Sequence, residues 1–424
     1  MSRYKDYPGY KDSGVEWVGS IPNSWDVSPL FSLASTDVLK NDDGAENNVL
    51  SLSYGRIIRR DVEDNHGLLP ESFNTYQLVA AGDIILRLTD LQNDKRSLRV
   101  GLACEKGIIT SAYLKLTAKQ KFLDRYLYRL LHSYDTTKVF YGMGGGLRQS
   151  MKFEEMRRLQ MLCPSLEEQK QIADFLDHET AKIDALIEKQ QRLIELLKEK
   201  RQAVISHAVT KGLNPNAPMK DSGVEWLGNI PFDWECVRLK FASQLSGGKV
   251  APSNEERYVG LENVQSNSGK FIATEEVIPE GISNVFSRGD VLFGKLRPYL
   301  AKSWLADFSG ICSSEFLVMT SRKVDSKFLH YFTLTEEFIK QVDSSTYGSK
   351  MPRASWDYIG LLNIPIPSHE SEKIASFLDH ETAKIDALIE KQLRLIELAK
   401  ERRTALISAA VTGKIDVRDW QAAA

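Results

Sequence analysis

Two long stretches of the chain carry apolar residues at alternating three- and four-residue spacing, the pattern of one face of an α-helix. In the first stretch the apolar positions are Ile183, Leu186, Ile187, Leu193, Ile194, Leu197, Val204 and Ile205. Gln190 interrupts this stripe, and Gly212 just beyond it is a helix-stop signal. A helix from Glu179 to Val209 would be roughly 45 Å long at 1.5 Å per residue.

The second stretch repeats the first almost letter for letter. FLDHETAKIDALIEKQ occupies residues 175–190 and returns at 377–392. Each apolar stripe needs a cover, and the other copy can provide it. Because NPNAP at 214–218 lets the chain turn back, we predict an antiparallel coiled coil in which Gln190 and Gln392 help to fix the register. The simplest alternative is a helical hairpin that only holds two domains together.

The predicted helix–helix interface takes the apolar positions of both copies together with the two glutamines. It comprises Ile183, Leu186, Ile187, Gln190, Leu193, Ile194, Leu197, Ile385, Leu388, Ile389, Gln392, Leu395 and Ile396. A lysine at Ile187 or Leu388 would place a charge in this interface. Either substitution is therefore expected to break the helix pair and impair complex assembly.

Upstream of each helix, shorter patterns predict a globular α/β domain. Apolar runs predict strands in DIILRL (83–88), IITSAYLKL (108–116), DVLFGKL (290–296) and EFLVMT (315–320). Residues 121–134 and 326–342 have the spacing of amphipathic helices. The basic and polar loops GMGGGLRQS and YGSKMPRAS follow these helices.

The repeat extends to the whole chain. KDSGVEWVGSIPNSWDV at 11–27 has a second copy that begins at Lys220, GDIIL at Gly82 pairs with GDVLF at Gly289, and GIITSAYL pairs with GICSSEFL. The predicted parts are an N-terminal arm 1–27, a globular domain 28–168, a first helix 169–212, a linker with the second arm 213–236, a second globular domain 237–368, a second helix 369–412 and a C-terminal tail 413–424.

The composition is that of an ordinary soluble protein, with 42% hydrophobic and 26% charged residues among 424. Four scattered cysteines without a CxxC pair argue against a disulfide framework or a zinc site and fit a reducing cytosol. No apolar run approaches the ~20 residues that span a bilayer. We therefore expect a soluble, cytoplasmic protein.

Charge gives only a local indication of nucleic-acid binding. The formal net charge is −2, but residues 51–160 carry 18 basic against 12 acidic residues, whereas residues 237–367 carry 15 against 14. The first domain is thus basic and the second is close to neutral. An excess of this size is equally common on an ordinary solvated face.

No familiar catalytic motif is present in the sequence. It lacks a GxxxxGK[ST] phosphate loop, a GxSxG nucleophile elbow, an HExxH zinc motif and the loops of an adenine methyltransferase. The nuclease-like Glu168-Gln169-Lys170 lies at a predicted helix start without an acidic partner, and glycines 144–146 are more typical of a loop than of a phosphate cradle. We predict no catalytic residues and no metal site.

The duplication itself carries a functional hypothesis. Segments that face identical partners stay alike, whereas segments that face different ligands diverge. Two nearly identical helices indicate two copies of one partner, and two divergent domains indicate two ligands of one kind. Two DNA half-sites fit this description, since dimeric readers place half-sites about 34–36 Å apart, a distance comparable to the predicted helix length.

The arms GVEWVGSIPNSW and GVEWLGNIPFDW, the GD strands, and PSLEEQKQIADFLDHETAKIDALIEKQ with its partner PSHESEKIASFLDHETAKIDALIEKQ resemble the specificity subunit of Type I restriction-modification systems over essentially the full chain. The resemblance departs at SHESEK (368–373), where the family usually has an acidic residue followed by Gln. Ser165 and Glu168 form a capping-box signature in the first copy, but the second offers only Ser368 and Ser371.

The resemblance implies two target recognition domains, each reading one half of a split, asymmetric site on double-stranded DNA. It implies that the helices pair as an antiparallel coiled coil that spaces the domains. Two methyltransferase (M) subunits would dock on the chain and use S-adenosylmethionine, and two restriction (R) subunits, where present, would use ATP and Mg. The chain itself would bind no cofactor and no membrane.

Candidate DNA-contacting residues are Lys and Arg, which suit phosphates and guanine, and Gln or Asn, which suit adenine. In the first domain they are Arg87, Lys95, Arg96, Arg99, Arg148 and Gln149. In the second domain they are Asn263, Lys295, Arg297, Lys350 and Arg353. Arg87 and Lys295 lie near the ends of predicted strands, Asn263 lies near an early strand, and the others follow a strand or lie in a polar loop.

Two hypotheses of other classes remain open at this point. A helical-hairpin scaffold that bridges two non-DNA ligands predicts no salt-dependent DNA affinity, whereas a DNA reader predicts a steep salt dependence. An enzyme with an unrecognised site in one globular domain predicts turnover by the isolated chain, abolished when carboxylates of that domain are replaced.

Overall fold

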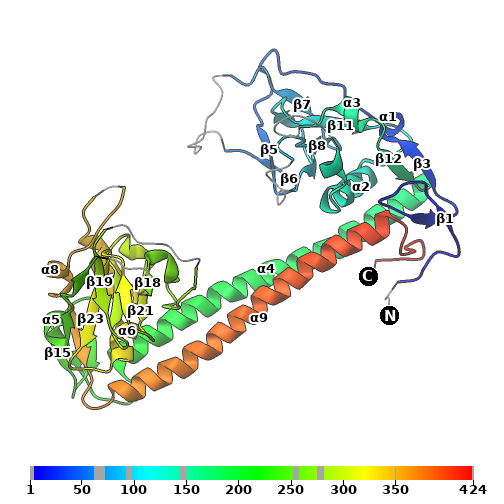
Figure 1. Cartoon of the computed structure of the whole chain (residues 1–424). Helices are drawn as coiled ribbons and strands as arrows, with labels where there is room; N and C mark the ends of the chain where they lie inside the picture. The colour runs from blue at the N-terminus through cyan, green and yellow to red at the C-terminus, as the bar shows by residue number, and fades with distance from the viewer. Residues whose placement is uncertain are drawn as a thin grey trace. The chain divides into compact units, whose positions relative to one another are not determined.

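The structure is a computed structural model that describes residues 4–61, 72–91, 98–143, 150–251, 257–274, 281–348 and 350–422. The chain forms two compact units, Met1–Lys189 with Leu395–Ala424 and Gln190–Arg394. Each unit holds one α/β domain and one end of each of two long helices, α4 (Leu166–Lys211) and α9 (Ser371–Val411) (Figure 1). The predicted fold class is confirmed. In the described residues, no helix has the length and apolar character needed to cross a membrane.

The first unit contains twelve strands in its described part. They are β1 (Tyr10–Asp12), β2 (Ser20–Pro22), β3 (Asp26–Pro29), β4 (Ala34–Ser35), β5 (Leu50–Ser53), β6 (Arg56–Arg59), β7 (Gln77–Val79), β8 (Ile84–Leu86), β9 (Val100–Leu102), β10 (Gly107–Ile109), β11 (Leu114–Ala118) and β12 (Gln160–Cys163). Its shorter helices are α1 (Leu30–Leu33), α2 (Asp124–Thr136), the 3₁₀ turn η1 (Val139–Gly142) and α3 (Phe153–Met156).

The second unit also contains twelve strands in its described part. They are β13 (Met219–Asp221), β14 (Asn229–Pro231), β15 (Glu235–Arg238), β16 (Ser243–Leu245), β17 (Lys249–Val250), β18 (Tyr258–Val259), β19 (Ser283–Phe286), β20 (Val291–Gly294), β21 (Ser303–Leu305), β22 (Gly310–Cys312), β23 (Phe316–Ser321) and β24 (Asn363–Ile366). Its shorter helices are α5 (Leu239–Ala242), η2 (Leu261–Asn263), η3 (Pro298–Leu300), α6 (Ser326–Thr333), α7 (Glu336–Ser344) and α8 (Trp356–Ile359).

The two domains share one sheet topology although their sequences diverge. The central sheet has the order β4-β11-β8-β9 in the first unit and β16-β23-β20-β21 in the second. All neighbours in both sheets are antiparallel. The middle strands are apolar on both faces, so β8 and β20 are fully buried. The tandem duplication inferred from the motifs is therefore present in the backbone.

Two predicted elements are each divided in two. The run 108–116 forms β10 and β11 on either side of a turn in which the Tyr113 amide donates to Thr110 O at 3.2 Å. The run 326–342 forms α6 and α7, because the Thr335 hydroxyl accepts from the Phe338 amide and starts a new helix. The spacing of apolar residues alone predicts neither the turn nor the new helix start.

Both long helices begin earlier than Glu179 and its equivalent. Ser165 Oγ accepts from the Glu168 amide at 3.2 Å, so one half of the predicted capping box is present at the start of α4. Ser368, the counterpart in the second copy, instead donates to Asp233 O. Gly212 (φ +75°) and Gly413 (φ +70°) adopt the left-handed conformation just past α4 and α9, as expected of helix-terminating glycines.

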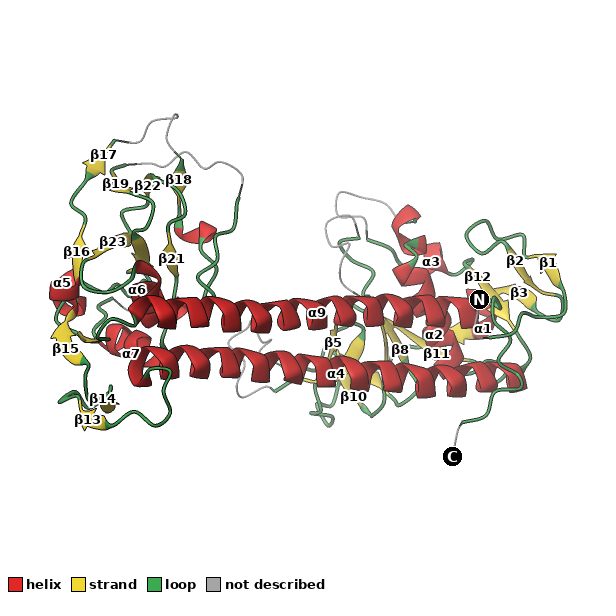
Figure 2. Ribbon diagram, turned by 90° about the horizontal axis from the view of Figure 1, so that it is seen from below, coloured by secondary structure: helices red, strands yellow, loops and turns green. Residues whose placement is uncertain are grey.

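Within each unit the two helices run antiparallel, and they lie side by side in both views (Figure 1 and Figure 2). In the second unit Arg201 Nε of α4 is 3.1 Å from Asp386 Oδ1 of α9. In the first unit Arg403 Nε of α9 is 3.1 Å from Asp184 Oδ1 of α4. These ion pairs are equivalent under the 202-residue repeat. The two helices therefore pair in the same register in each unit.

The helix–helix interface is narrower than predicted. The buried predicted positions are Ile183, Ile194, Ile385, Gln392 and Ile396, and the partly buried ones are Ile187, Gln190, Leu197 and Ile389. Four residues were wrongly predicted to lie in the interface, because their side chains are 40–48% exposed. They are Leu186, Leu193, Leu388 and Leu395. Each of these leucines directly precedes a seam residue of the seven-residue repeat and is therefore turned about 100° around the helix from it.

Each arm ends in a tryptophan that is hydrogen bonded to the start of a long helix. Trp25 is fully buried, and its Nε1 donates to Glu168 Oε1 at 2.9 Å. The Tyr7 hydroxyl donates to the same oxygen at 2.7 Å, and burial together with this carboxylate raises the pKa of Tyr7. In the second unit Trp234 Nε1 donates to Glu370 Oε1 at 2.9 Å. Glu168 therefore has a structural role rather than a nuclease-like one.

We expect Trp25→Phe to destabilise the first unit by about 1–3 kcal/mol, because a buried carboxylate loses a hydrogen-bond donor. Thermal unfolding of the full chain would measure the effect. The matched Trp234→Phe variant should cost less, since Glu370 is only partly buried and water can replace the lost donor. Equal losses in the two variants would contradict this assignment of the buried carboxylate.

Candidate nucleic-acid interface

Two loops of the second domain are joined through their backbones and carry most of its predicted DNA-contacting residues. One follows β20 (295–301), and the other precedes α8 (346–348 and 350–354); we call them the paired loops. The Arg297 amide donates to Pro352 O at 2.8 Å, and the Ala354 amide donates to Lys295 O at 2.9 Å. The structure thus brings together Lys295, Arg297, Lys350 and Arg353.

The exposed side chains of the paired loops combine positive charge with aromatic surface. Arg297 and Lys350 are exposed, and Tyr299 and Tyr347 are 50% and 64% exposed. Arg297 has φ +50°, a left-handed conformation that costs a non-glycine residue about 1–2 kcal/mol. Strained backbone of this kind concentrates at functional sites. The two tyrosines were missed in the sequence analysis, although the basic RPYL and YGSK contexts contain them.

Arg353 has a different position from its neighbours. Its Nε and Nη2 atoms lie 3.1 Å from Glu315 Oε1, and the Lys295 amide donates to Glu315 O at 2.9 Å. Glu315 therefore neutralises Arg353 and ties both loops to the start of β23. We assign Arg353 to loop support rather than to DNA contact.

A hollow of about 410 Å³ lies beside the paired loops and shares Lys295 with them. Its polar lining consists of Ser246, Lys249, Asn284, Lys295 and Ser314, and the rest of its lining is apolar. None of the lining residues is acidic. The Ser246 hydroxyl and the Asn284 amide donate to backbone carbonyls, so the two ammonium groups are the donors that suit a phosphate oxygen. Lys249 therefore joins the candidates, although its sequence context did not single it out.

Asn263 was predicted wrongly as a base-contacting residue. Its side chain is only 6% exposed. Oδ1 accepts from the Gly260 amide at 2.8 Å, while Nδ2 donates to Ile272 O at 3.1 Å and Thr274 Oγ1 at 2.8 Å. The amide is therefore occupied in stabilising the turn around η2. Its polar character, which made it a candidate, reflects this internal role.

In its described residues, the first domain has the counterpart of one of the two hydrogen bonds that join the paired loops. The Met151 amide, just before α3, donates to Leu88 O, just after β8, at 2.9 Å. This bond corresponds to the one from the Ala354 amide, before α8, to Lys295 O, after β20. Arg87 lies in the segment after β8 and is partly exposed. Four candidates of this domain lie outside the described residues: Lys95, Arg96, Arg148 and Gln149.

Arg99 was also predicted wrongly, because it is fully buried. Its guanidinium donates to Thr89 O at 2.7 Å, Asp90 O at 3.1 Å and Arg87 O at 3.2 Å. Three carbonyls from one segment thus converge on a single arginine. Arg99 shapes the loop after β8 rather than facing solvent.

A second candidate surface consists of those exposed leucines of the long helices that are leucine and exposed in both copies. In the first unit these are Leu186 of α4 with Leu395 and Leu398 of α9, and in the second unit Leu388 of α9 with Leu193 and Leu196 of α4. We call each group of three a leucine set. The two sets are exchanged by the 202-residue repeat, so each unit presents the same three residues. Their exposure ranges from 40% to 52%.

The described residues contain no group of three His, Cys, Asp or Glu side chains that could hold a metal ion. Residues 64–197 match the family model of the Type I restriction modification DNA specificity domain. The Type I restriction enzyme MjaVIII specificity subunit of Methanocaldococcus jannaschii is 27% identical over 333 residues, which cover 74% of this chain and 76% of that protein. The chain is a homologue of the specificity subunits of type I restriction-modification systems.

Further similar proteins are also type I restriction-modification subunits or share the fold of one. The Type I restriction enzyme EcoDI specificity subunit of Escherichia coli is 24% identical over 229 residues, 49% of this chain and 51% of that protein. A chain from a structure on assembly and conformational transition of the type I R-M system has a TM-score of 0.61 at 16% identity, covering 92% of this chain and 98% of that one. The HsdS subunit from Thermoanaerobacter tengcongensis has a TM-score of 0.50 at 14% identity, covering 93% and 98%. These structures share the fold.

Proposed function

We propose that this specificity-subunit homologue is the DNA-reading, non-catalytic subunit of a Type I restriction-modification complex. Each globular domain reads one half of a bipartite, asymmetric site on double-stranded DNA, and the long helices set the spacing. The observation that carries the proposal is the loop pair at the same place in both domains, which in the second domain presents exposed cations and tyrosines. Cations suit phosphates and guanine, and aromatic side chains add apolar contact with base edges.

The same proposal gives the long helices a role in assembly. Two identical leucine sets, one per unit, suit two copies of one methyltransferase subunit. Exposed apolar side chains that are grouped together are typical of an interaction surface. S-adenosylmethionine belongs to those methyltransferase subunits, and ATP and Mg belong to the restriction subunits that join them.

The test is a methylome. Cells without adenine methylation would express this chain with its methyltransferase subunit, and control cells would express the methyltransferase alone. Single-molecule sequencing should find a split, asymmetric adenine-methylated motif only when this chain is present. A soluble complex with an active methyltransferase that gives no chain-dependent motif would refute the proposal and favour the scaffold hypothesis.

Arg297→Ala tests the paired loops in the same assay. We expect a loss of about 1–3 kcal/mol in recognition, that is, roughly ten- to hundredfold less methylation at limiting enzyme. Relaxed sequence at one position of the second half-site would indicate a base contact, and uniform weakening with a shallower salt slope would indicate a phosphate contact. Arg322→Ala, which removes an exposed arginine that bonds to Gln244, is the matched control. Wild-type methylation by Arg297→Ala would exclude this loop.

A further inference from the structure

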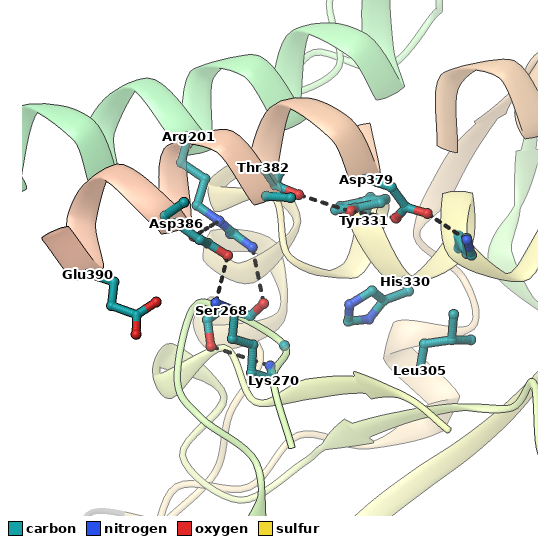
Figure 3. Close-up of a pocket in the computed structure, with 14 residues that line it drawn as sticks. Arg201, Ser268, Lys270, Leu305, His330, Tyr331, Asp379, Thr382, Asp386 and Glu390 are labelled. Carbon is teal, nitrogen blue, oxygen red and sulfur yellow. Dashed lines mark hydrogen bonds and ion pairs between the residues drawn. The ribbon is translucent and has the colours of Figure 1, made fainter. Parts of the chain in front are cut away.

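One carboxylate in each unit lies where the globular domain and both long helices meet. In the second unit Asp386 of α9 is 3.1 Å from Arg201 of α4 and 3.0 Å from Lys270 of the domain (Figure 3). In the first unit the corresponding residue, Asp184 of α4, is 3.1 Å from Arg403 of α9 and 3.4 Å from Arg56 of the domain. Asp184 and Asp386 are equivalent under the repeat, so the three-way contact occurs twice. We call each a junction.

The domains supply their cations from different places. Arg56 is the first residue of β6, whereas Lys270 lies in the segment that follows η2. The helices are nearly identical, so inheritance alone accounts for the Arg–Asp pair between them. Inheritance does not account for a domain cation in each junction, because the domain sequences have diverged. The recurrence therefore points to a shared requirement for holding each domain on its helix ends.

The second junction grips a turn of the domain as well as a side chain. Arg201 is only 7% exposed and donates from Nη1 to Asn267 O at 3.1 Å. It also donates from Nη2 to Ser268 O at 3.1 Å (Figure 3). Asn267 and Gly269 adopt left-handed backbone conformations, with φ +59° and +69°. A Cβ on Gly269 would lie 2.5 Å from the His330 ring, so the turn is seated directly on α6. One arginine thus links α4, α9 and the domain.

The turn that Arg201 holds has a neutral histidine on one side and an open cleft on the other. Burial, and to a smaller extent the charge of Arg201, lower the pKa of His330 to about 4, so the ring is neutral at physiological pH. A cleft of about 530 Å³ opens beside the turn, between Lys270, His330 and α9. Packing therefore does not fill the space into which the turn would move. The turn is held by the Arg201 hydrogen bonds to Asn267 O and Ser268 O, and Asp386 orients Arg201 and pairs with Lys270.

We propose that Asp184 and Asp386 are positioning residues for DNA recognition: each sets the angle at which its domain stands on the helix pair, and hence the half-site spacing that the chain accepts. This inference rests on the proposed function of the chain as a DNA reader. Neither carboxylate contacts DNA, because both face cations of their own unit.

Asp386→Asn tests the inference, since it removes the charge and keeps the shape. In the methylome assay we expect unchanged half-site sequences but a ratio of off-spacing to cognate methylation that rises by about tenfold, an ordinary size for coupling between sites. Asp184→Asn should act in the same way. Glu195→Gln, which removes an exposed carboxylate paired with Arg192 on α4, is the matched control and should keep the wild-type ratio.

Three results distinguish the possible failures. If wild-type chain directs no methylation, the proposed function fails. If wild-type chain is active and Asp386→Asn keeps the wild-type spacing ratio, this inference is overturned, even if methylation falls equally at all spacings, because that is what simple loss of stability produces. Should Asp386→Asn not fold, Lys270→Gln removes only the 55%-exposed partner and should raise the ratio in the same direction. Wild-type hydrogen exchange in α6 would show that the variant domain is folded.

Discussion

A lysine at Ile385 is expected to destabilise the helix pair of the second unit strongly, whereas a lysine at Leu388 is not. Ile385 is 4% exposed and Leu388 is 46% exposed, although both belong to the same apolar stripe. Lysine at Ile385 would bury an unpaired ammonium group and lose the packing of the isoleucine, for a cost of about 3–5 kcal/mol. At Leu388 the ammonium group would remain in water.

Differential scanning calorimetry of the full-length variants would measure this difference. For a unit of this size, such a cost corresponds to a fall in Tm of about 10 °C in Ile385→Lys. Leu388→Lys should unfold within a degree or two of the wild type, by analogy with other exposed helix positions. Equal destabilisation by both lysines would restore the broader interface that the sequence alone predicts and would contradict the observed burial.

The second large effect concerns assembly. Replacing Leu193, Leu196 and Leu388 together with Ser should leave a complex with one methyltransferase subunit in place of two. Each leucine that becomes buried on docking contributes about 1 kcal/mol beyond its present burial, so the set contributes about 3 kcal/mol, or roughly a hundredfold in affinity. Native mass spectrometry of the purified complex would count the subunits.

The repeat provides the matched control for this experiment. The set Leu186, Leu395 and Leu398 lies on the first unit and should give the same single-subunit complex when replaced alone. Replacing both sets should leave the chain without a methyltransferase subunit. A complex that keeps two subunits after one set is replaced, or that loses both, would contradict docking at two equivalent helix surfaces.

The long helices show how far a periodic pattern leads. Spacing and the verbatim repeat predicted two paired helices, and Gly212 and Gly413 marked their ends correctly. The predicted helices begin at 169 and 369, and α4 and α9 begin at Leu166 and Ser371. The pattern did not show that Glu168 and Glu370, at these helix starts, accept hydrogen bonds from the tryptophans of the arms. Each of these hydrogen bonds joins residues more than a hundred positions apart, and no local pattern records it.

The candidate DNA-contacting residues also divide into those that the sequence placed correctly near one another and those whose role only the fold reveals. The sequence indicated Lys295, Arg297 and Lys350 as candidates, and in the structure they lie on one pair of joined loops. It also selected Arg99 and Asn263, which the fold buries to satisfy carbonyls and amides. The local sequence around a single polar residue near a strand does not distinguish a DNA contact from an internal hydrogen bond. Only the surrounding backbone decides whether its donors are already used.

The sequence by itself determined the duplication, the α/β class, the paired helices and the family resemblance, because each is written in residues close together or repeated in order. The tertiary structure alone decided which leucines stay exposed, which arginines are internal, and that Asp184 and Asp386 each meet a cation from the domain and one from the other helix. Burial and ion pairing depend on groups that are distant along the chain and only come together when it folds.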